Sequence, residues 1–375
     1  MISKIPSPLR YGDGVALVNP AGVLPERFKN QHGYVKAHLE ELGFLVKDLV
    51  IESGWEDALR RSETLQAAFT DPQVKAILPL CGGARIYDIL PLIDYDVLAS
   101  HPKIFCGSSE LSALVVTIAE KAGMVTFFGP HLNFLNPKAS KLENRFTVRS
   151  FWNMLQWDWH GRNGLTKNEA YHFFAAPRKP TLPVTIRNIY RDPTCITNDS
   201  YRDNFYHAPG SGQSVTGKLL IGSLAVLVKL CEEGLSPDVT DKIVMLDALD
   251  MSLGTVGELS QRLNAHCDLS RTVAVVFSSL AERTDRANLL YPELRDPNRV
   301  RDFLREVSTL LGGGPPLFHG FPVGHCAYKL TLPIGITASI VVETGDLLIA
   351  ESPYNNKGRI EQVLFGLFTF LQEVR

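Results

Sequence analysis

Short apolar runs alternate with helix-spaced apolar positions along the first third of the chain. Val15–Val18, Val74–Leu80 and Lys103–Cys106 are typical of buried strands. Between the first two runs, residues 34–42 carry apolar side chains at helical spacing, and Gly43 supplies a helix stop. Strands that alternate with helices in this way predict a parallel sheet covered by helices.

The pattern fades after about residue 150 and returns near residue 216. The middle stretch, 151–215, contains Trp157 and Trp159 among basic residues and prolines, and we interpret it as an insertion or linker. Strand and helix patterns then resume and end in a predicted closing helix over Ile360–Val374. We therefore expect an α/β protein, with an N-terminal parallel-sheet domain over 1–150 and a smaller mixed α/β domain over 216–375.

The composition and charge of the chain exclude several classes of protein. Its 375 residues are 45% hydrophobic and 21% charged, which is enough for a substantial core. Lys plus Arg number 38 against 40 Asp plus Glu, and this balance argues against a nucleic-acid binder or a polybasic membrane binder. No apolar run reaches the roughly 18 to 20 residues of a membrane span, and the N-terminus lacks the order of a secretory signal, so we expect a cytoplasmic protein. Six cysteines without a C-x-x-C pair predict reduced thiols.

One stretch partly matches a phosphate-binding loop. Gly212–Lys218 reads G-Q-S-V-T-G-K, but Leu219 stands where that motif requires Ser or Thr. No strand pattern precedes Gly212, so the backbone cradle of such a loop has no scaffold. We favour a flexible loop at the entry to the second domain.

The corner after the strand at Lys103–Cys106 has the better chemistry. A buried strand, a tight Gly turn and a helix follow one another over Ile104–Ala113, which would expose Ser108 or Ser109 at the carboxyl edge of the sheet, as in a nucleophile elbow. The alternative is that either serine only caps the helix. Gly82 and Gly83 end the neighbouring strand, where a ligand could approach the backbone, or where the pair only makes a tight turn.

A serine nucleophile needs a base and a carboxylate that orients the base. His325 lies in a loop framed by Gly and Pro, and Asp247 ends the apolar strand Ile243–Leu246. Spacing alone cannot choose among ten histidines, and an isolated His or Asp is more often structural than catalytic.

Three cysteines adjoin these candidate elements, namely Cys81, Cys106 and Cys326. A metal cluster of Cys and His is one interpretation. Alternation along a strand or loop should turn some of these thiols away from a common point. We favour small core residues.

Several spaced motifs together indicate a family. They are Val15–Gly22, Leu80–Gly83, Leu90–Asp96, Pro102–Ala113, Val125–Pro130, Gly217–Leu224, Ile243–Asp247 and Gly320–Pro333. In this order, over nearly the whole chain apart from the middle stretch, the sequence resembles the L,D-carboxypeptidase family, which includes the microcin C immunity peptidases.

The resemblance implies a site and a reaction. The family's nucleophilic Ser lies in a G-Y-S-D turn, which corresponds to Ser109, and its late G-H motif corresponds to His325. The resemblance also implies an oxyanion hole from backbone N–H groups of Gly82, Gly83 and Glu110. It implies no metal or organic cofactor, a small peptide or a peptidyl- or aminoacyl-nucleotide conjugate as substrate, and a homodimer.

The departures from the family pattern affect the acid and the substrate. The Glu of the family's L-E-D is here Asp247, which can serve the same electrostatic role if the strand approaches closer. Ser223 replaces Asn in the family's G-G-N-L, and Arg85 stands where Gly or Asn is common.

Four residues are predicted to bind substrate. They are Arg85, Ser223, Trp157 and Trp159. The tryptophans could instead pack between domains or at a dimer interface.

With the same site, acyl transfer or ester or lactone hydrolysis is an alternative reaction. A ligand-binding homologue that has lost catalysis is an alternative from another class.

Overall fold

A computed structural model of the chain describes residues 4–22, 24, 26–135, 142–156, 184–186, 214–248, 251–278, 296–326, 329–341, 347–349, 351 and 353–354. These residues form two compact units. Unit 1 falls within Met1–Lys179, Leu330–Gly335 and Ser352–Ile360, and unit 2 falls within Pro180–Lys329, Ile336–Glu351 and Glu361–Arg375. The predicted closing helix and most of the stretch 151–215 lie outside the described residues.

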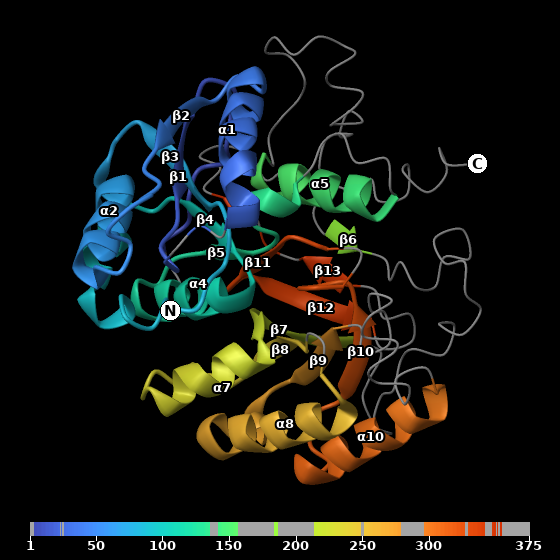
Figure 1. The fold of residues 1–375 in the computed structure, drawn as a ribbon. Helices are drawn as coiled ribbons and strands as arrows, with labels where there is room; N and C mark the ends of the chain where they lie inside the picture. Colours follow the sequence, from blue (N-terminus) through green and yellow to red (C-terminus); the bar gives the residue numbers. More distant parts are fainter. Residues whose placement is uncertain are drawn as a thin grey trace. The chain divides into compact units, whose positions relative to one another are not determined.

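Unit 1 contains a sheet whose described strands have the order β11-β5-β4-β3-β1-β2 (Figure 1). The strands are β1 (Gly14–Val18), β2 (Leu45–Asp48), β3 (Val74–Pro79), β4 (Ile104–Gly107), β5 (Thr126–Phe128) and β11 (Leu332–Ile334). Neighbours are parallel, except that β11 pairs antiparallel with β5. Every residue of β1, β4 and β5 is buried, as expected of strands that are covered on both faces.

Helices lie on both sides of this sheet, with α2 on one side and α1 and α5 on the other in Figure 1. The helices are α1 (Glu26–Glu41), α2 (Ala58–Thr70), α3 (Tyr95–Ser100), α4 (Ser112–Lys121) and α5 (Leu142–Leu155), with short 3₁₀ turns η1 (Leu90–Leu92), η2 (Ser109–Leu111) and η3 (Leu132–Phe134). Local signals set their ends: the Asp57 side chain accepts from the Arg60 N–H at the start of α2. Gly43, at φ +86°, follows α1, as predicted.

Unit 2 contains a mixed sheet whose described strands have the order β10-β9-β8-β7-β12-β13-β6. The strands are β6 (Val184–Ile186), β7 (Ser214–Ser223), β8 (Lys242–Asp247), β9 (Ala274–Ser278), β10 (Leu317–Phe321), β12 (Thr337–Val341) and β13 (Leu347–Ile349). The strands β7, β8, β9 and β10 are parallel, and the other pairings are antiparallel. The helices are α7 (Leu224–Glu232), α8 (Leu253–Cys267) and α10 (Pro297–Leu310), which lie side by side in Figure 1, and the 3₁₀ turn η6 (Leu269–Arg271).

This architecture confirms the predicted fold class, a parallel-sheet α/β unit followed by a mixed α/β unit. Two details differ from the predictions. The sheet of unit 1 gains an antiparallel edge strand, β11, from a distant part of the chain. The predicted flexible loop at Gly212–Lys218 is wrong from Ser214 onward, because these residues form β7 and pair with β12. An extended strand cannot wrap a phosphate, so the partial loop motif is no phosphate site. No helix among the described residues is long and apolar enough to cross a membrane.

Candidate active site

The predicted site residues of unit 1, together with a histidine that was not predicted, follow the carboxyl ends of adjacent parallel strands. β3 leads to the Gly82-Gly83 turn, β4 leads to Ser108 and Ser109, and β5 leads to His131. Because parallel strands end at the same edge, the fold brings these segments together, and open α/β sheets bind ligands at this edge.

Ser109 has the strained backbone of an elbow. Its φ of +57° lies in the left-handed region, which costs a residue other than Gly about 1–3 kcal/mol. Ser108 occupies the N-cap of η2, yet its side chain makes no capping hydrogen bond. The Ser109 carbonyl accepts from the Ser112 hydroxyl at 2.5 Å, and the Ser108 carbonyl accepts from the Leu111 N–H at 3.1 Å. The left-handed φ of Ser109 and the missing capping bond of Ser108 favour the elbow over the capping role.

The Gly82-Gly83 turn lies against this elbow. A Cβ placed on Gly82 would be 3.5 Å from the Cβ of Ser109, and one on Gly83 would be 2.4 Å from the Ala21 carbonyl oxygen. Only glycine therefore fits at position 83. The Gly82 N–H donates to Nδ1 of His131 at 3.2 Å. Because that N–H has one proton to donate, the geometry does not support Gly82 as an oxyanion donor.

In unit 2, β7 and β8 end in register, so that Ser223 and Asp247 are paired neighbours. Asp247 is 1% exposed, and its carboxylate accepts three hydrogen bonds. Nδ1 of His325 lies 2.6 Å from Oδ2, the His325 N–H donates to Oδ1 at 3.2 Å, and the Ser223 hydroxyl donates to Oδ2 at 3.0 Å. A carboxylate can only accept hydrogen bonds, so the imidazole of His325 carries its proton on Nδ1, which faces Asp247. Its Nε2 then has a lone pair that can accept a proton.

Gly324 explains how the shorter acid reaches the histidine. Its φ is +82°, and an added Cβ would lie 2.1 Å from the Asp247 Cγ. The Asp247 carboxylate thus packs directly on the Gly324 backbone, next to His325. The absence of a side chain at Gly324 lets the Asp247 carboxylate lie within hydrogen-bond distance of the His325 ring.

The remaining predicted residues have different surroundings. Arg85 is half-exposed, donates from Nε to Asp88 at 2.8 Å, and has its guanidinium carbon 5.7 Å from the Trp55 ring centroid. Ser223 is buried, with its hydroxyl on Asp247 rather than toward a ligand, so its predicted role in substrate binding is not supported. Trp157 and Trp159 lie outside the described residues.

The buried Arg61 side chain connects the loops at this edge of the sheet through hydrogen bonds. Arg61 is 1% exposed and donates from Nη1 to the carbonyl oxygens of Pro20 at 2.6 Å and Arg85 at 2.9 Å. Burial lowers the pKa of Arg61 below its ordinary value, and Asp88 opposes this shift. The cation thereby ties together two loops at the carboxyl edge of the unit 1 sheet.

The cysteines next to the site are core residues. Cys81, Cys106 and Cys326 are buried, and burial raises the pKa of the Cys106 thiol. Over the described ranges, no group of three or more His, Cys, Asp or Glu side chains is placed to hold a metal ion.

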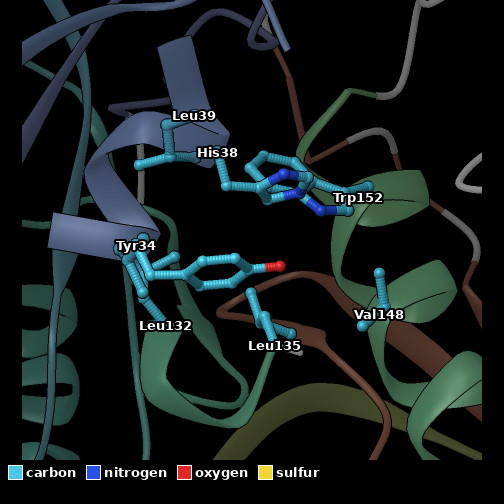
Figure 2. Close-up of a pocket in the computed structure, with 8 residues that line it drawn as sticks. Tyr34, His38, Leu39, Leu132, Leu135, Val148 and Trp152 are labelled. Atoms are coloured by element: carbon cyan, nitrogen blue, oxygen red, sulfur yellow. The ribbon is translucent and has the colours of Figure 1, made fainter. Parts of the chain in front are cut away.

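A small recess lies elsewhere in unit 1 (Figure 2). Tyr34 and His38 of α1, Leu132 of η3 and Trp152 of α5 are among the residues that line it. None of the predicted site residues that the structure describes is among its lining residues. Its largely apolar wall marks a packing recess between helices.

Sequence reasoning missed His131 and Gly324. His131 lies three residues after the end of β5, so the rule that selected Ser109 and Gly82, a residue that follows a parallel strand, could have found it. Gly324 carried a weaker signal, because a glycine beside a histidine does not reveal which side chain packs on it.

Comparison with known proteins places both units in one family. Residues 15–129 match the LD-carboxypeptidase N-terminal domain, and residues 216–340 match the LD-carboxypeptidase C-terminal domain. Together these matches cover more than half of the chain.

Three relatives share most of this length. A Vibrio cholerae protein named "putative carboxypeptidase" is 26% identical over 88% of this chain and 93% of its own. The Escherichia coli microcin C7 self-immunity protein MccF is 24% identical over 92% and 95%. A Bacillus subtilis protein named "probable murein peptide carboxypeptidase" is 24% identical over 89% and 91%.

Solved structures agree in fold. MccF in complex with aspartyl sulfamoyl adenosine matches with a TM-score of 0.69 and 20% identity, over 94% of this chain and 100% of that one. With both domain matches in chain order and the fold in common, this chain belongs to the L,D-carboxypeptidase family.

Proposed function

We propose that this chain is a serine hydrolase that cleaves an amide bond of a small peptide or of an aminoacyl-nucleotide conjugate through an acyl-enzyme. Ser109 is the nucleophile, His325 the base, and Asp247 the acid that orients the base. Membership in a carboxypeptidase family supports hydrolysis as the reaction class.

The proposed reaction has two halves. The Ser109 Oγ attacks the carbonyl carbon of the substrate while His325 Nε2 takes the hydroxyl proton. The carbon–nitrogen bond of the tetrahedral intermediate breaks, and His325 returns the proton to the leaving amine. Water then attacks the acyl-enzyme while His325 takes its proton; the bond between the acyl carbon and Ser109 Oγ breaks, His325 returns the proton to Oγ, and the acid product leaves. Backbone N–H groups of Gly83 and Glu110 stabilise the oxyanion, at about 3 to 4 kcal/mol per donor.

The set of hydrogen bonds at Asp247 carries this proposal. A buried carboxylate that accepts from the Nδ1 side of an imidazole fixes the tautomer and the ring orientation that general-base catalysis needs. The same observation weighs against a degenerate, binding-only homologue. Ser223 and Asp247, two of the departures from the family pattern, bond to each other and preserve an oriented histidine.

The named relatives suggest two substrate classes. MccF has been solved with aspartyl sulfamoyl adenosine and with glutamyl sulfamoyl guanosine, and the Bacillus subtilis relative is named for murein peptides. Half-exposed Arg85 is the proposed partner for a substrate carboxylate, because a guanidinium pairs well with carboxylates even when one nitrogen is engaged by Asp88.

Product analysis by mass spectrometry tests the proposal. Wild type and Ser109→Ala are incubated with a murein tetrapeptide that ends in D-Ala and with aspartyl sulfamoyl adenosine. We expect wild type to release D-Ala from the first or aspartate from the second, and Ser109→Ala to release neither while it remains folded. Full activity of Ser109→Ala would refute the assignment. Ligated rather than hydrolysed product would indicate acyl transfer.

A further inference from the structure

His131 contacts both turns of the unit 1 half-site, although no step of the proposed reaction uses it. It is 3% exposed and lies between β5 and η3. Its Nδ1 faces the Gly82 N–H at 3.2 Å, and its Nε2 faces the Ser108 carbonyl oxygen at 2.8 Å and the Ser108 hydroxyl at 3.4 Å. One ring thus bridges the ends of β3 and β4.

These partners assign the protonation of the ring. The Gly82 N–H can only donate, so Nδ1 carries no proton. The Ser108 carbonyl can only accept, so Nε2 carries the proton. His131 is therefore a neutral imidazole with both nitrogens engaged by backbone, and it has no lone pair left to act as a base.

The His131 ring connects the Gly82-Gly83 turn to the Ser109 elbow, and each of these segments needs support from its surroundings. Gly82 and Gly83 have no side chains to restrict them, and glycine is the residue with the most backbone freedom. Ser109 holds a left-handed φ of +57° that its surroundings must enforce. The ring contacts the Gly82 N–H on one side and, on the other, the carbonyl oxygen of Ser108, the residue that precedes Ser109.

We propose that His131 is a positioning residue that holds the Gly82-Gly83 turn and the Ser109 elbow in register, so that the Gly83 and Glu110 N–H groups converge on the oxyanion. This inference rests on the proposed function. Oxyanion donors act because they are pre-aimed, and a displacement of about 1 Å can cost roughly 100-fold in rate. Loss of the bridge should therefore weaken transition-state stabilisation and leave ground-state binding nearly unchanged.

The test uses an alkyl fluorophosphonate, which needs no knowledge of the natural substrate. Attack by Ser109 forms the oxygen–phosphorus bond and expels fluoride, while the hydroxyl proton passes to the base. The second-order labelling rate is measured for wild type, His131→Leu, His131→Gln and Ser109→Ala, and the labelled peptide is identified by mass spectrometry. His38→Leu is the matched control, because it removes another unit 1 histidine, one that lines the pocket in Figure 2.

We expect His131→Leu to label Ser109 about 100-fold more slowly than wild type, and His38→Leu to label it at the wild-type rate. His131→Gln keeps an acceptor and a donor on one group, so its rate should lie between those of wild type and His131→Leu, and it decides the question if His131→Leu does not fold. With the substrate that wild type hydrolyses, kcat should fall and KM should stay within about threefold.

Two results would overturn the inference in distinguishable ways. If both His131 variants label at the wild-type rate, or lose thermal stability without any change in rate, then His131 is only structural, and the proposed function stands. If wild type is not labelled at Ser109, or Ser109→Ala is labelled equally, then the proposed function fails and the role of His131 fails with it.

Discussion

Substitution of Gly324 by alanine should separate the Asp247 carboxylate from His325. An added Cβ would lie 2.1 Å from the Asp247 Cγ, whereas ordinary contact begins near 3.4 Å, so the loop or the carboxylate must move by roughly 1.3 Å. If the whole shift separates Nδ1 from Oδ2, their distance grows from 2.6 Å to at most about 4 Å, beyond a hydrogen bond.

The expected loss of activity is large. Removing the orienting carboxylate of a catalytic triad lowers kcat by about 10⁴-fold. A displaced carboxylate still stabilises the protonated imidazole electrostatically, although it no longer orients the ring. We therefore expect Gly324→Ala to lower kcat by about 100-fold or more. The left-handed φ adds a strain of about 1–3 kcal/mol to the free energy of folding.

Gly234 provides a matched control for that strain. It lies in the same unit at φ +77°, against +82° for Gly324, and an added Cβ there meets nothing within 4 Å. Gly234→Ala should therefore lose a similar amount of stability and keep its activity. Steady-state hydrolysis and urea unfolding of the two variants measure the two effects separately. Equal activity in both variants would refute the reasoning that Asp247 must touch His325.

Two further predictions concern unit 2. Ser223→Ala removes one of the three hydrogen bonds to the Asp247 carboxylate, so kcat should fall by about 10-fold and the free energy of unfolding by about 1.5–3 kcal/mol, whereas Ser223→Thr should keep both at the wild-type value. Steady-state kinetics and urea unfolding measure these two quantities. Wild-type values for Ser223→Ala would contradict the prediction. Burial lowers the pKa of His319 to about 4, below the unfolded value of 6.5, so the native state binds fewer protons than the unfolded state between these pH values. The free energy of unfolding should therefore fall by roughly 3 kcal/mol as the pH drops from 6.5 to about 4. Urea unfolding at pH 7, 5 and 4 should show a weaker pH dependence for His319→Phe than for wild type. An unchanged pH dependence in the variant would contradict the lowered pKa of His319.

Local pattern was sufficient for most of the framework. The buried runs that become β1, β3 and β8, and the helical spacing that becomes α1, follow from side-chain periodicity, which adjacent residues encode. The same logic located the edge of the sheet where Ser109 lies, because a residue that follows a parallel strand must emerge there. The spaced motifs added the family and the pairing of Asp247 with His325.

Tertiary structure decided the partners of the polar groups. Ser223 contacts Asp247 because β7 and β8 pair in register, and β11 joins the first sheet from some 200 residues away along the chain. The hydrogen bond from the Gly82 N–H to His131 joins residues 49 positions apart in the sequence. Periodicity reports only whether a position faces the core. Which donor meets which acceptor is determined when strand register brings distant residues within about 3 Å, and the chemistry of the site is set at that step.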